Sequence, residues 1–250
     1  MTHIPKPNPP LAYEDKDFMK SSEARIVRIS AEFLQPTQHL TKANIKNTVV
    51  FFGSARLKPT SKYYQSAEEL AKRIAIWGRD TMDNKVIMAT GGGPGIMEAA
   101  NKGALEAGAK TIGFGITLPF EQANNDYVSP DLSFSFKYFF IRKFWLAAPS
   151  SAFVAFPGGF GTMDELFEIL TLMQTGKMRN IPVVLFGKTF WTKLFNFELL
   201  VEEGLISKED LDLFLITDDV CEAYDYITTR AEALAKQTKP LDTGIEKNGH

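Results

Sequence analysis

Cysteine and histidine are scarce in this chain of 250 residues. It holds one cysteine, Cys221, and three histidines, His3, His39 and His250. A single cysteine excludes an internal disulfide framework and a cysteine-rich metal site, and it fits a reducing compartment. The histidines lie within the first forty residues or at the last position, outside the expected core. We therefore predict neither histidine-based catalysis nor a metal site.

Long apolar runs and an excess of one charge are also lacking. No stretch of eighteen apolar residues occurs, and the first residues have no apolar core of a signal peptide. We therefore expect a soluble, cytoplasmic protein with no membrane partner. Lys and Arg total 28 against 30 Asp and Glu, a net charge of −2. This balance does not favour nucleic acid as a partner, so a small molecule is expected.

Local composition divides the chain into an arm, one domain and a tail. Residues 1–20, with four prolines and then a charged run, are typical of a flexible, extended arm. Residues 21–238 form the domain, and residues 239–250 form a polar, disordered tail. Apolar residues at helical spacing between about Ser22 and Leu40 predict an extra helix that packs on the domain. These residues are Ile26, Val27, Ile29, Phe33 and Leu34.

From residue 47 onward, short β-branched or aromatic runs alternate with longer helical stretches. Runs this apolar are buried on both faces of a sheet, and the helices between them require parallel strands. We predict an α/β fold, a Rossmann-like doubly wound parallel sheet in a single domain with an extra N-terminal helix. The expected strands are Thr48–Phe52, Lys85–Ala89, Thr111–Ile116, Ala152–Phe156, Pro182–Phe186 and Leu213–Ile216. The expected helices lie around Lys62–Trp77, Gly95–Ala107, Tyr138–Ala148, Thr162–Gln174, Phe190–Glu203 and Asp219–Ala235.

Glycine is concentrated in two clusters that occupy equivalent places. Gly91–Gly95 and Gly158–Gly161 each follow an apolar strand and precede a helix. Such turns lie at the carboxyl ends of parallel strands, where the amides of a helix start can bind a phosphate. Neither cluster completes the dinucleotide pattern GxGxxG, and Gly187-Lys188-Thr189 lacks the first glycine of a Walker A loop. The sequence supports neither an NAD-binding protein nor a P-loop NTPase.

Simpler structural roles exist for the same residues. The glycines could form tight turns without a ligand. Thr162 and Glu165 have the spacing of a capping box, in which the glutamate satisfies a helix amide. Spacing alone favours this role for Glu165. Arg142 and Lys143 could be a solvated helix face, but their segment, Tyr138–Trp145, is unusually aromatic, and basic residues in such a setting rarely lack an anionic partner.

The residues from Pro157 to Glu165 read PGGFGTMDE, and Arg142-Lys143 precede them. These residues resemble the PGGxGTxxE signature and the basic pair of the Lonely Guy (LOG) family of nucleoside 5′-monophosphate phosphoribohydrolases. The likeness runs from about residue 23 to 220 and is similar to the longer bacterial branch. The further segments that carry it are Phe52–Arg56, Gly91–Asn101, Leu118–Gln122, Phe139–Lys143 and Leu170–Lys177.

The resemblance implies hydrolysis of the N-glycosidic bond of a nucleoside 5′-monophosphate, AMP or a cytokinin ribotide, to free base and ribose 5-phosphate. It implies that Arg142 and Glu165 are catalytic and that the Gly158–Thr162 loop holds the phosphate. It also implies a homodimer or larger homo-oligomer, built on the glycine-loop helices. The positions that it implies for substrate binding are Ser54, Gly92, Gly93, Glu98, Glu121, Lys143, Gly158, Gly159, Gly161, Thr162 and Thr171.

The sequence also bears on two other functions, lysine decarboxylation and binding without hydrolysis. Members of the family have been labelled lysine decarboxylases, but such an enzyme needs pyridoxal phosphate on a lysine, typically in a His-Lys setting. No His-Lys dipeptide occurs in the chain, and we expect no cofactor. The alternative function is a Rossmann-like module that binds a nucleotide or molybdenum cofactor without hydrolysis. The presence of both Arg142 and Glu165 favours the enzyme.

The chemistry of bond cleavage suggests roles for these residues. A ribosyl–base bond breaks through an oxocarbenium-like state, which a carboxylate stabilises. We expect Glu165 to lie in the first turn of its helix, to be ionised, and to orient or deprotonate the attacking water. The leaving base takes its proton from Asp164, from solvent or from no acid at all. Phe114-Gly115 replaces a Leu-Asn pair of many relatives, so AMP and isopentenyl-adenine ribotide both stay candidate substrates.

Overall fold

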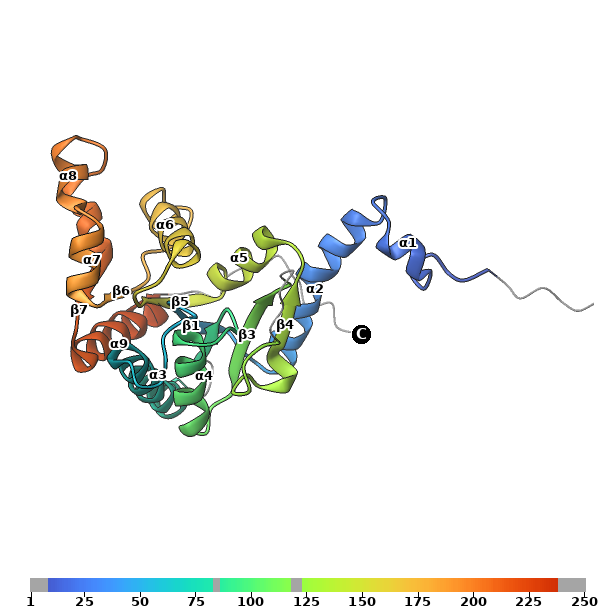
Figure 1. Cartoon of the computed structure of the whole chain (residues 1–250), viewed down its shortest axis with the longest axis horizontal. Helices are drawn as coiled ribbons and strands as arrows, with labels where there is room; N and C mark the ends of the chain where they lie inside the picture. The colour runs from blue at the N-terminus through green and yellow to red at the C-terminus, as the bar shows by residue number, and fades with distance from the viewer. Residues whose placement is uncertain (1–8, 83–85, 118–122, 238–250) are drawn as a thin grey trace, which may run out of the picture.

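A sheet of seven parallel strands lies at the centre of the protein in its computed structural model, which describes residues 9–82, 86–117 and 123–237 (Figure 1). Each strand pairs in parallel with its neighbours, in the order β4-β3-β2-β1-β5-β6-β7. The strands are β1 Asn47–Phe52, β2 Val86–Thr90, β3 Thr111–Ile116, β4 Ser133–Phe136, β5 Ser150–Ala155, β6 Val183–Phe186 and β7 Phe214–Thr217. The predicted Rossmann-like, doubly wound fold is confirmed.

The order of the strands changes direction at β1. Strands β2, β3 and β4 follow one another on one side of β1, and β5, β6 and β7 follow on the other. In doubly wound sheets, ligands bind outside the carboxyl ends of the strands at this reversal. We therefore expect a ligand-binding site at the turns that follow β1, β2 and β5.

Helices cover both faces of the sheet (Figure 1). One face packs against α2, α5, α6 and α7, and the other against α3, α4 and α9. Among the described residues, no helix combines the length and apolarity needed to span a membrane. The helices are α1 Lys16–Lys20, α2 Arg25–Lys42, α3 Lys62–Thr81, α4 Ile96–Glu106, α5 Phe139–Ala147, α6 Phe160–Gln174, α7 Lys188–Leu194, α8 Phe197–Glu202 and α9 Val220–Gln237, with 3-10 turns at Pro130–Leu132 and Lys208–Leu213.

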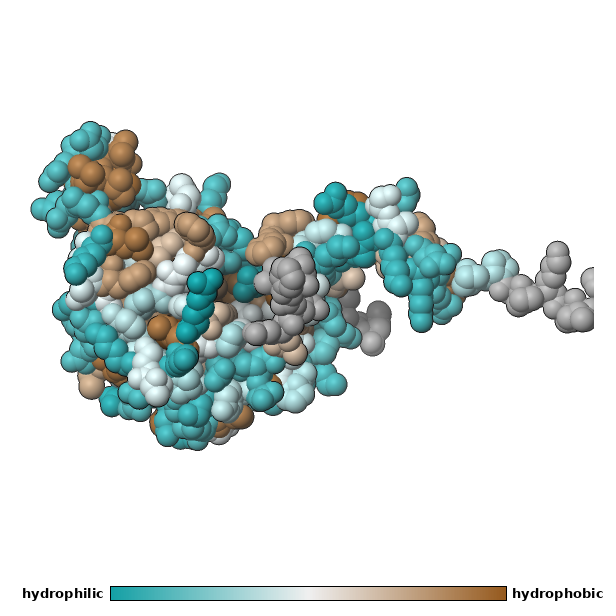
Figure 2. Space-filling model, in the orientation of Figure 1, coloured by the Kyte–Doolittle hydropathy of each residue, from teal (hydrophilic) through white to brown (hydrophobic). Residues whose placement is uncertain are grey.

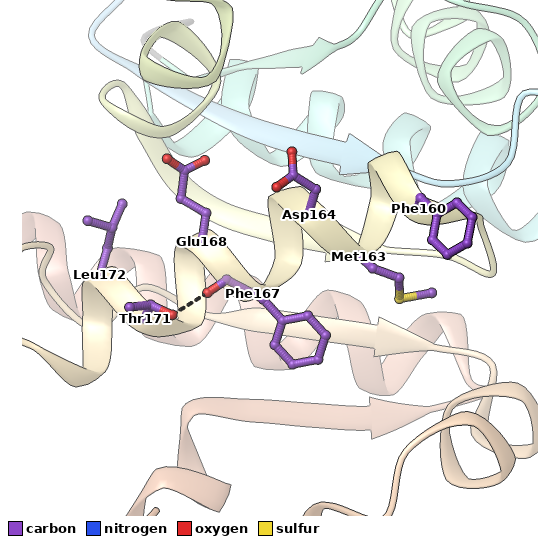
Figure 3. Close-up of a pocket in the computed structure, with 7 residues that line it drawn as sticks. All are labelled: Phe160, Met163, Asp164, Phe167, Glu168, Thr171 and Leu172. Carbon is purple, nitrogen blue, oxygen red and sulfur yellow. Dashed lines mark hydrogen bonds between the residues drawn. The ribbon is translucent and has the colours of Figure 1, made fainter. Parts of the chain in front are cut away.

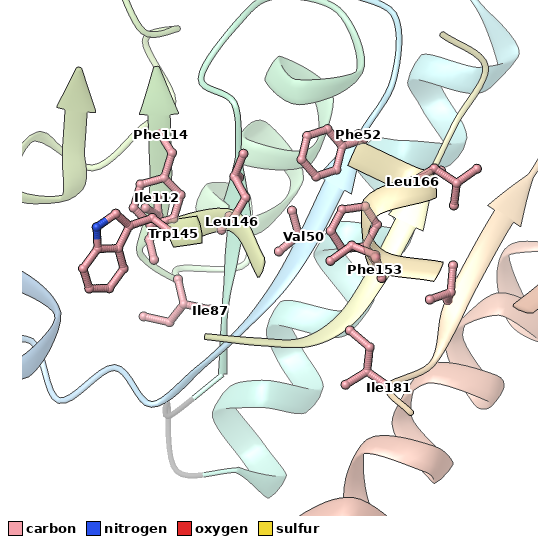
Figure 4. Close-up of a cluster of buried hydrophobic side chains, with 14 of the residues drawn as sticks. Val50, Phe52, Ile87, Ile112, Phe114, Trp145, Leu146, Phe153, Leu166 and Ile181 are labelled. Carbon is pink, nitrogen blue, oxygen red and sulfur yellow. The ribbon is translucent and has the colours of Figure 1, made fainter. Parts of the chain in front are cut away.

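The apolar core between the sheet and helices α5 and α6 supports the residues of the candidate active site. Figure 4 shows this cluster, in which Leu146 of α5 and Leu166 of α6 lie over strand residues such as Phe52 and Phe153. The rings of Phe52 and Phe153 stack with centroids 4.7 Å apart. Burial of this apolar surface fixes α5 and α6 on the sheet, since about 25 cal/mol is gained for each Å² removed from water.

The amino-terminal segment differs from its prediction. Residues Lys16–Lys20 form a short helix, capped by the Asp15 carboxylate, where an extended arm was expected. Helix α2 packs on the body through Ile29 and Phe33, as predicted. Its other predicted core residues are exposed, with Leu34 at 67%. Figure 1 shows that α1 and the first part of α2, which contains Ile26 and Val27, project beyond the sheet and its covering helices. Leu34 is exposed although its neighbour Phe33 packs on the core, so it lies on the other side of α2.

Two further elements were predicted incorrectly. Strand β4 was missed, although its sequence, Ser-Phe-Ser-Phe, alternates between exposed and buried residues at the sheet edge beside β3. The helix expected at Phe190–Glu203 is two helices, α7 and α8. The chain leaves the helix at Phe195, and the Asn196 side chain accepts a hydrogen bond from the Leu199 amide to begin α8. The predicted tail at 239–250 and the first eight residues lie outside the described part of the chain.

Candidate active site

The turn after β1 joins the two glycine clusters. The Ser54 amide donates to the Pro157 carbonyl at 2.9 Å, and the Ser54 carbonyl accepts from the Ile96 amide at 3.2 Å. The first bond reaches the loop after β5, and the second reaches the start of α4 after the Gly91–Gly95 loop. The structure thus brings together three predicted segments at the carboxyl edge of neighbouring strands β2, β1 and β5.

A buried polar network holds the first glycine loop. The Gly92 amide donates to Thr90 Oγ1 at 2.9 Å, and Thr90 Oγ1 donates to Asn101 Oδ1 at 2.8 Å. Asn125 Nδ2 donates to Asn101 Oδ1 at 3.0 Å and to the carbonyl of Gly93 at 2.9 Å. Gly92 itself has a φ of +75°, which favours glycine. The loop conformation is therefore fixed before any ligand arrives.

The side chains of this network were not predicted from the sequence. One signal was present, because Asn101 lies among small apolar residues on the buried side of α4. A buried amide in such a place requires hydrogen-bond partners. Asn124 gave no comparable signal: its Nδ2 donates to Ser133 Oγ at 2.8 Å, and its side chain occupies the space beside Gly92 and Gly115.

The second glycine loop has one packed and two open glycines. A side chain at Gly158 would collide with the Thr162 side chain and approach the Gly53 backbone. At Gly159 and Gly161, nothing described lies within 4 Å of where a Cβ would be. Neither of these two has a positive φ. Because neither packing nor backbone conformation requires glycine at these two positions, close approach of a ligand is a physical reason for it.

The capping box that spacing suggested for Glu165 does not form. Helix α6 begins at Phe160 with Gly159 as its N-cap, and within this described segment no side chain caps its first turn. Glu165 therefore lies in the second turn, not in the first turn as expected. Thr162 is buried and lies against Gly158. The structure therefore contradicts the capping role that spacing suggested for the glutamate.

Glu165 is the buried carboxyl group of the site. Its side chain lies in the buried row of α6, and the residue is 5% exposed. Burial raises the pKa of the Glu165 carboxyl to about 7, while the positive charges of Arg142 and Lys143 act to lower it. Glu165 was expected to be ionised, from helix-start amides and from nearby Arg142; the amides lie a turn away, and burial outweighs the effect of Arg142 on the pKa. At neutral pH the carboxyl is poised between its two forms.

Arg142 approaches the site from α5. Its Nε donates to the carbonyl of Phe114, at the end of β3, at 2.8 Å. Its guanidinium lies against Gly91, where any side chain would collide with it. Burial lowers the pKa of Arg142, and the charge of Glu165 opposes this effect. Arginine keeps its proton at neutral pH in proteins, so the partly buried guanidinium places a positive charge near enough to act on the buried carboxyl group.

Lys143, the next residue of α5, points elsewhere. Its Nζ lies 2.9 Å from Asp164 Oδ1 and 3.0 Å from Glu168 Oε2, both on α6. Figure 3 shows Asp164 and Glu168 on one side of α6, with Met163 and Phe167 on the other. The structure therefore places Lys143 in an ion-pair bridge between α5 and α6.

The remaining predicted binding residues are placed less centrally. Glu98 accepts a hydrogen bond from the Tyr64 hydroxyl at 2.8 Å. Thr171 is exposed, and its hydroxyl donates to the Phe167 carbonyl at 2.6 Å. It borders a shallow depression of about 520 Å³ on α6 that the site does not include. Glu121 lies outside the described residues. Within the part of the chain that is described, no group of three or more His, Cys, Asp or Glu residues could hold a metal.

Known proteins are similar to this chain. Residues 97–227 match the family described as "possible lysine decarboxylase". The chain is 32% identical over 169 residues to a probable cytokinin riboside 5′-monophosphate phosphoribohydrolase LOGL3 of Oryza sativa subsp. japonica, covering 66% of this chain and 75% of that protein. It is 29% identical over 174 residues to the corresponding LOG3 enzyme of Arabidopsis thaliana, covering 68% and 76%. The chain belongs to the LOG family.

The family match covers the LOG residues that the geometry brings together. Arg142, Gly158–Thr162 and Glu165 all lie within residues 97–227. Among solved structures, the molybdenum cofactor carrier protein MCP of Chlamydomonas reinhardtii is 26% identical, with 75% of this LOG chain and 99% of that chain covered and a TM-score of 0.48.

Proposed function

We propose that this LOG-family chain hydrolyses the N-glycosidic bond of a nucleoside 5′-monophosphate, AMP or a cytokinin ribotide, to free base and ribose 5-phosphate. The observation that carries the proposal is the buried Glu165 carboxyl, with the charge of Arg142 acting on it and an open glycine loop one turn before it. The names of the LOG relatives support the same reaction.

The charge of Glu165 suits the reaction. As the bond to the base breaks, positive charge develops on the ribose, and an ionised carboxylate stabilises this state more than the neutral substrate. The same group orients or deprotonates the attacking water, and a base acts best when its pKa lies near the working pH. Because burial raises the pKa of Glu165 to about 7, kcat/KM for the free protein rises with pH up to this value.

Arg142 holds the two halves of the site in register. It is anchored on the Phe114 carbonyl at the end of β3, and its charge opposes protonation of Glu165. Asp164, considered as an acid for the leaving base, has its carboxylate bonded to the Lys143 ammonium. Its side chain contacts α5 and is 59% exposed, so we take solvent as the source of the proton.

The phosphate loop gives a prediction that separates binding from packing. Gly159→Ala is expected to leave the free energy of unfolding within about 0.5 kcal/mol of the wild-type value, because the Cβ position is open. The added methyl group blocks approach of the phosphate, so KM for the nucleotide rises about tenfold. Gly158→Ala is the matched comparison, since its Cβ meets Thr162 and Gly53 and should cost about 1–3 kcal/mol of stability. Unchanged KM in Gly159→Ala contradicts a phosphate at this loop.

Incubation of the purified protein with AMP tests the proposed reaction. Chromatography should show adenine and ribose 5-phosphate appearing together as AMP is consumed. A nucleotide-binding module of the same fold would retain AMP without cleaving it. Recovery of intact AMP, and of an intact cytokinin ribotide in a parallel reaction, is the result that rejects hydrolysis.

The assembly predicted from the family resemblance stays a prediction, and α6 has the surface it needs. Phe160 at the start of α6 is 96% exposed, and it borders the shallow depression together with Met163 and Phe167. Figure 2 shows apolar side chains gathered over α6 on this face. Exposed aromatic residues of this kind are typical of protein interfaces, so a homodimer or larger homo-oligomer through α6 is the form we expect.

A further inference from the structure

A lysine bridges the two helices that carry the proposed catalytic residues. Lys143 of α5 lies 2.9 Å from Asp164 and 3.0 Å from Glu168 of α6, and its side chain is 18% exposed. An ammonium group this shielded from water requires compensating charges. Two carboxylates supply them, so Lys143 has its ionic partners within the protein itself.

We propose that Lys143 is a positioning residue, which together with Asp164 and Glu168 locks the helix of Arg142 to the helix of Glu165 and sets the charge around Glu165. The proposal rests on the reaction proposed above. It gives Lys143 a role that needs no contact with the nucleotide.

The sequence places the bridge directly beside both functional residues. Arg142 and Lys143 are consecutive on α5, so their side chains leave the helix about 100° apart. Arg142 reaches the Phe114 carbonyl, whereas Lys143 reaches across to α6. On α6, Asp164 and Glu168 are one turn apart, and Glu165 lies between them in sequence while facing the buried side. The bridge therefore fixes the distance and rotation between α5 and α6 at the point where the chemistry needs them.

The bridge also adjusts the electrostatic environment of Glu165. The positive charges of Arg142 and Lys143 favour its ionised form, and the negative charges of Glu168 and Asp164 oppose it. One ammonium between two carboxylates leaves a net charge of about −1 beside the buried glutamate. Removal of Lys143 exposes Glu165 to both carboxylates, while removal of either carboxylate leaves the lysine with a single partner.

Carboxyl titration of the unliganded protein tests the proposal without requiring turnover. The protein is labelled with ¹³C at the glutamate carboxyls, and the Glu165 signal is assigned by its loss in Glu165→Gln. The midpoint of Glu165 is expected to rise by about half a pH unit or more in Lys143→Met and to fall by a similar amount in Asp164→Asn and in Glu168→Gln. Lys143→Arg keeps the charge and should restore a midpoint close to that of the wild type. In an active protein, the acidic limb of the kcat/KM profile should move in the same directions.

The proposal predicts that the Glu165 midpoint shifts in opposite directions in the lysine and the carboxylate variants. General loosening of the helices would instead move the midpoint in the same direction in all the variants, and this result would overturn the proposal. The proposal is also overturned if the Glu165 midpoint does not change and KM for AMP rises in Lys143→Met alone. That result would mean that Lys143 contacts the substrate. Asp164 is 59% exposed at its side chain, so Asp164→Asn keeps the test valid if Lys143→Met fails to fold. If the wild-type protein releases no base from AMP, the proposed function fails, but the titration still decides whether the bridge controls Glu165.

Discussion

Replacement of Glu165 by glutamine is expected to lower the rate of base release by about a thousandfold or more. Glutamine has nearly the same shape and can occupy the same buried position on α6. It carries no negative charge for the ribose cation and cannot take a proton from water. Nucleotide binding should persist, because in the proposed mode the phosphate lies on Gly158–Thr162 and not on Glu165. The rate is measured by chromatography of the free base, and binding by calorimetry with AMP.

A matched control separates the loss of charge at the site from a general effect of the substitution. Glu106→Gln alters an exposed glutamate at the end of α4 and should leave the rate within about twofold of the wild-type value. Retained turnover in Glu165→Gln would mean that Glu165 has a structural role and that the reaction does not use its carboxylate.

The same substitution should make the protein more stable at alkaline pH. Burial raises the pKa of Glu165 from 4.5 to about 7, so the folded protein binds this proton more tightly than the unfolded chain does. The stability that the protonated group contributes is complete below about pH 4.5 and is lost as the pH rises through 7. At about 1.4 kcal/mol per pH unit, a shift of this size corresponds to about 3 kcal/mol. Glutamine, which has no charge to bury, avoids this loss.

Denaturant unfolding at two pH values measures the effect. Glu165→Gln should exceed the wild type by about 2 kcal/mol at pH 8.5, because the glutamine amide must find partners of its own, and the difference should largely disappear at pH 4.5. Glu106→Gln should show no such pH-dependent gain. A difference that is equal at both pH values would mean that the charge of Glu165 has no energetic cost in the folded protein. Functional residues often lower the stability of the folded protein in this way.

The sequence predicted the sheet well because its strands are apolar on both faces. Strand β3 was predicted at its exact bounds, Thr111–Ile116, and β1, β2, β5, β6 and β7 were placed within about two residues. Strand β4 was missed because its alternating serines and phenylalanines lie at an edge, where one face is open. The exposed residues of α2 were mispredicted for a related reason: apolar spacing cannot tell which side of α2 meets the sheet and which part projects beyond it.

The sequence allowed the two glycine loops to be placed side by side, but not the electrostatics of Glu165 to be predicted. The two glycine loops could be placed together because parallel strands end at one edge of a sheet. The protonation of Glu165 could not, because it depends on burial by residues distant in sequence and on a helix that begins two residues before its expected start. The role of Asn125 could not be predicted for the same reason. Its side chain donates to the carbonyls of Gly92 and Gly93, which are distant from it in sequence.

The most direct measurement of the central claim uses AMP in water enriched in ¹⁸O. The account predicts equal amounts of adenine and ribose 5-phosphate, with one ¹⁸O atom in the sugar phosphate at C1, because water attacks the ribose carbon as the base departs. Glu165→Gln in parallel should form neither product above background. Bound but intact AMP in the wild-type reaction, or a sugar phosphate without the label, would contradict hydrolysis at this site.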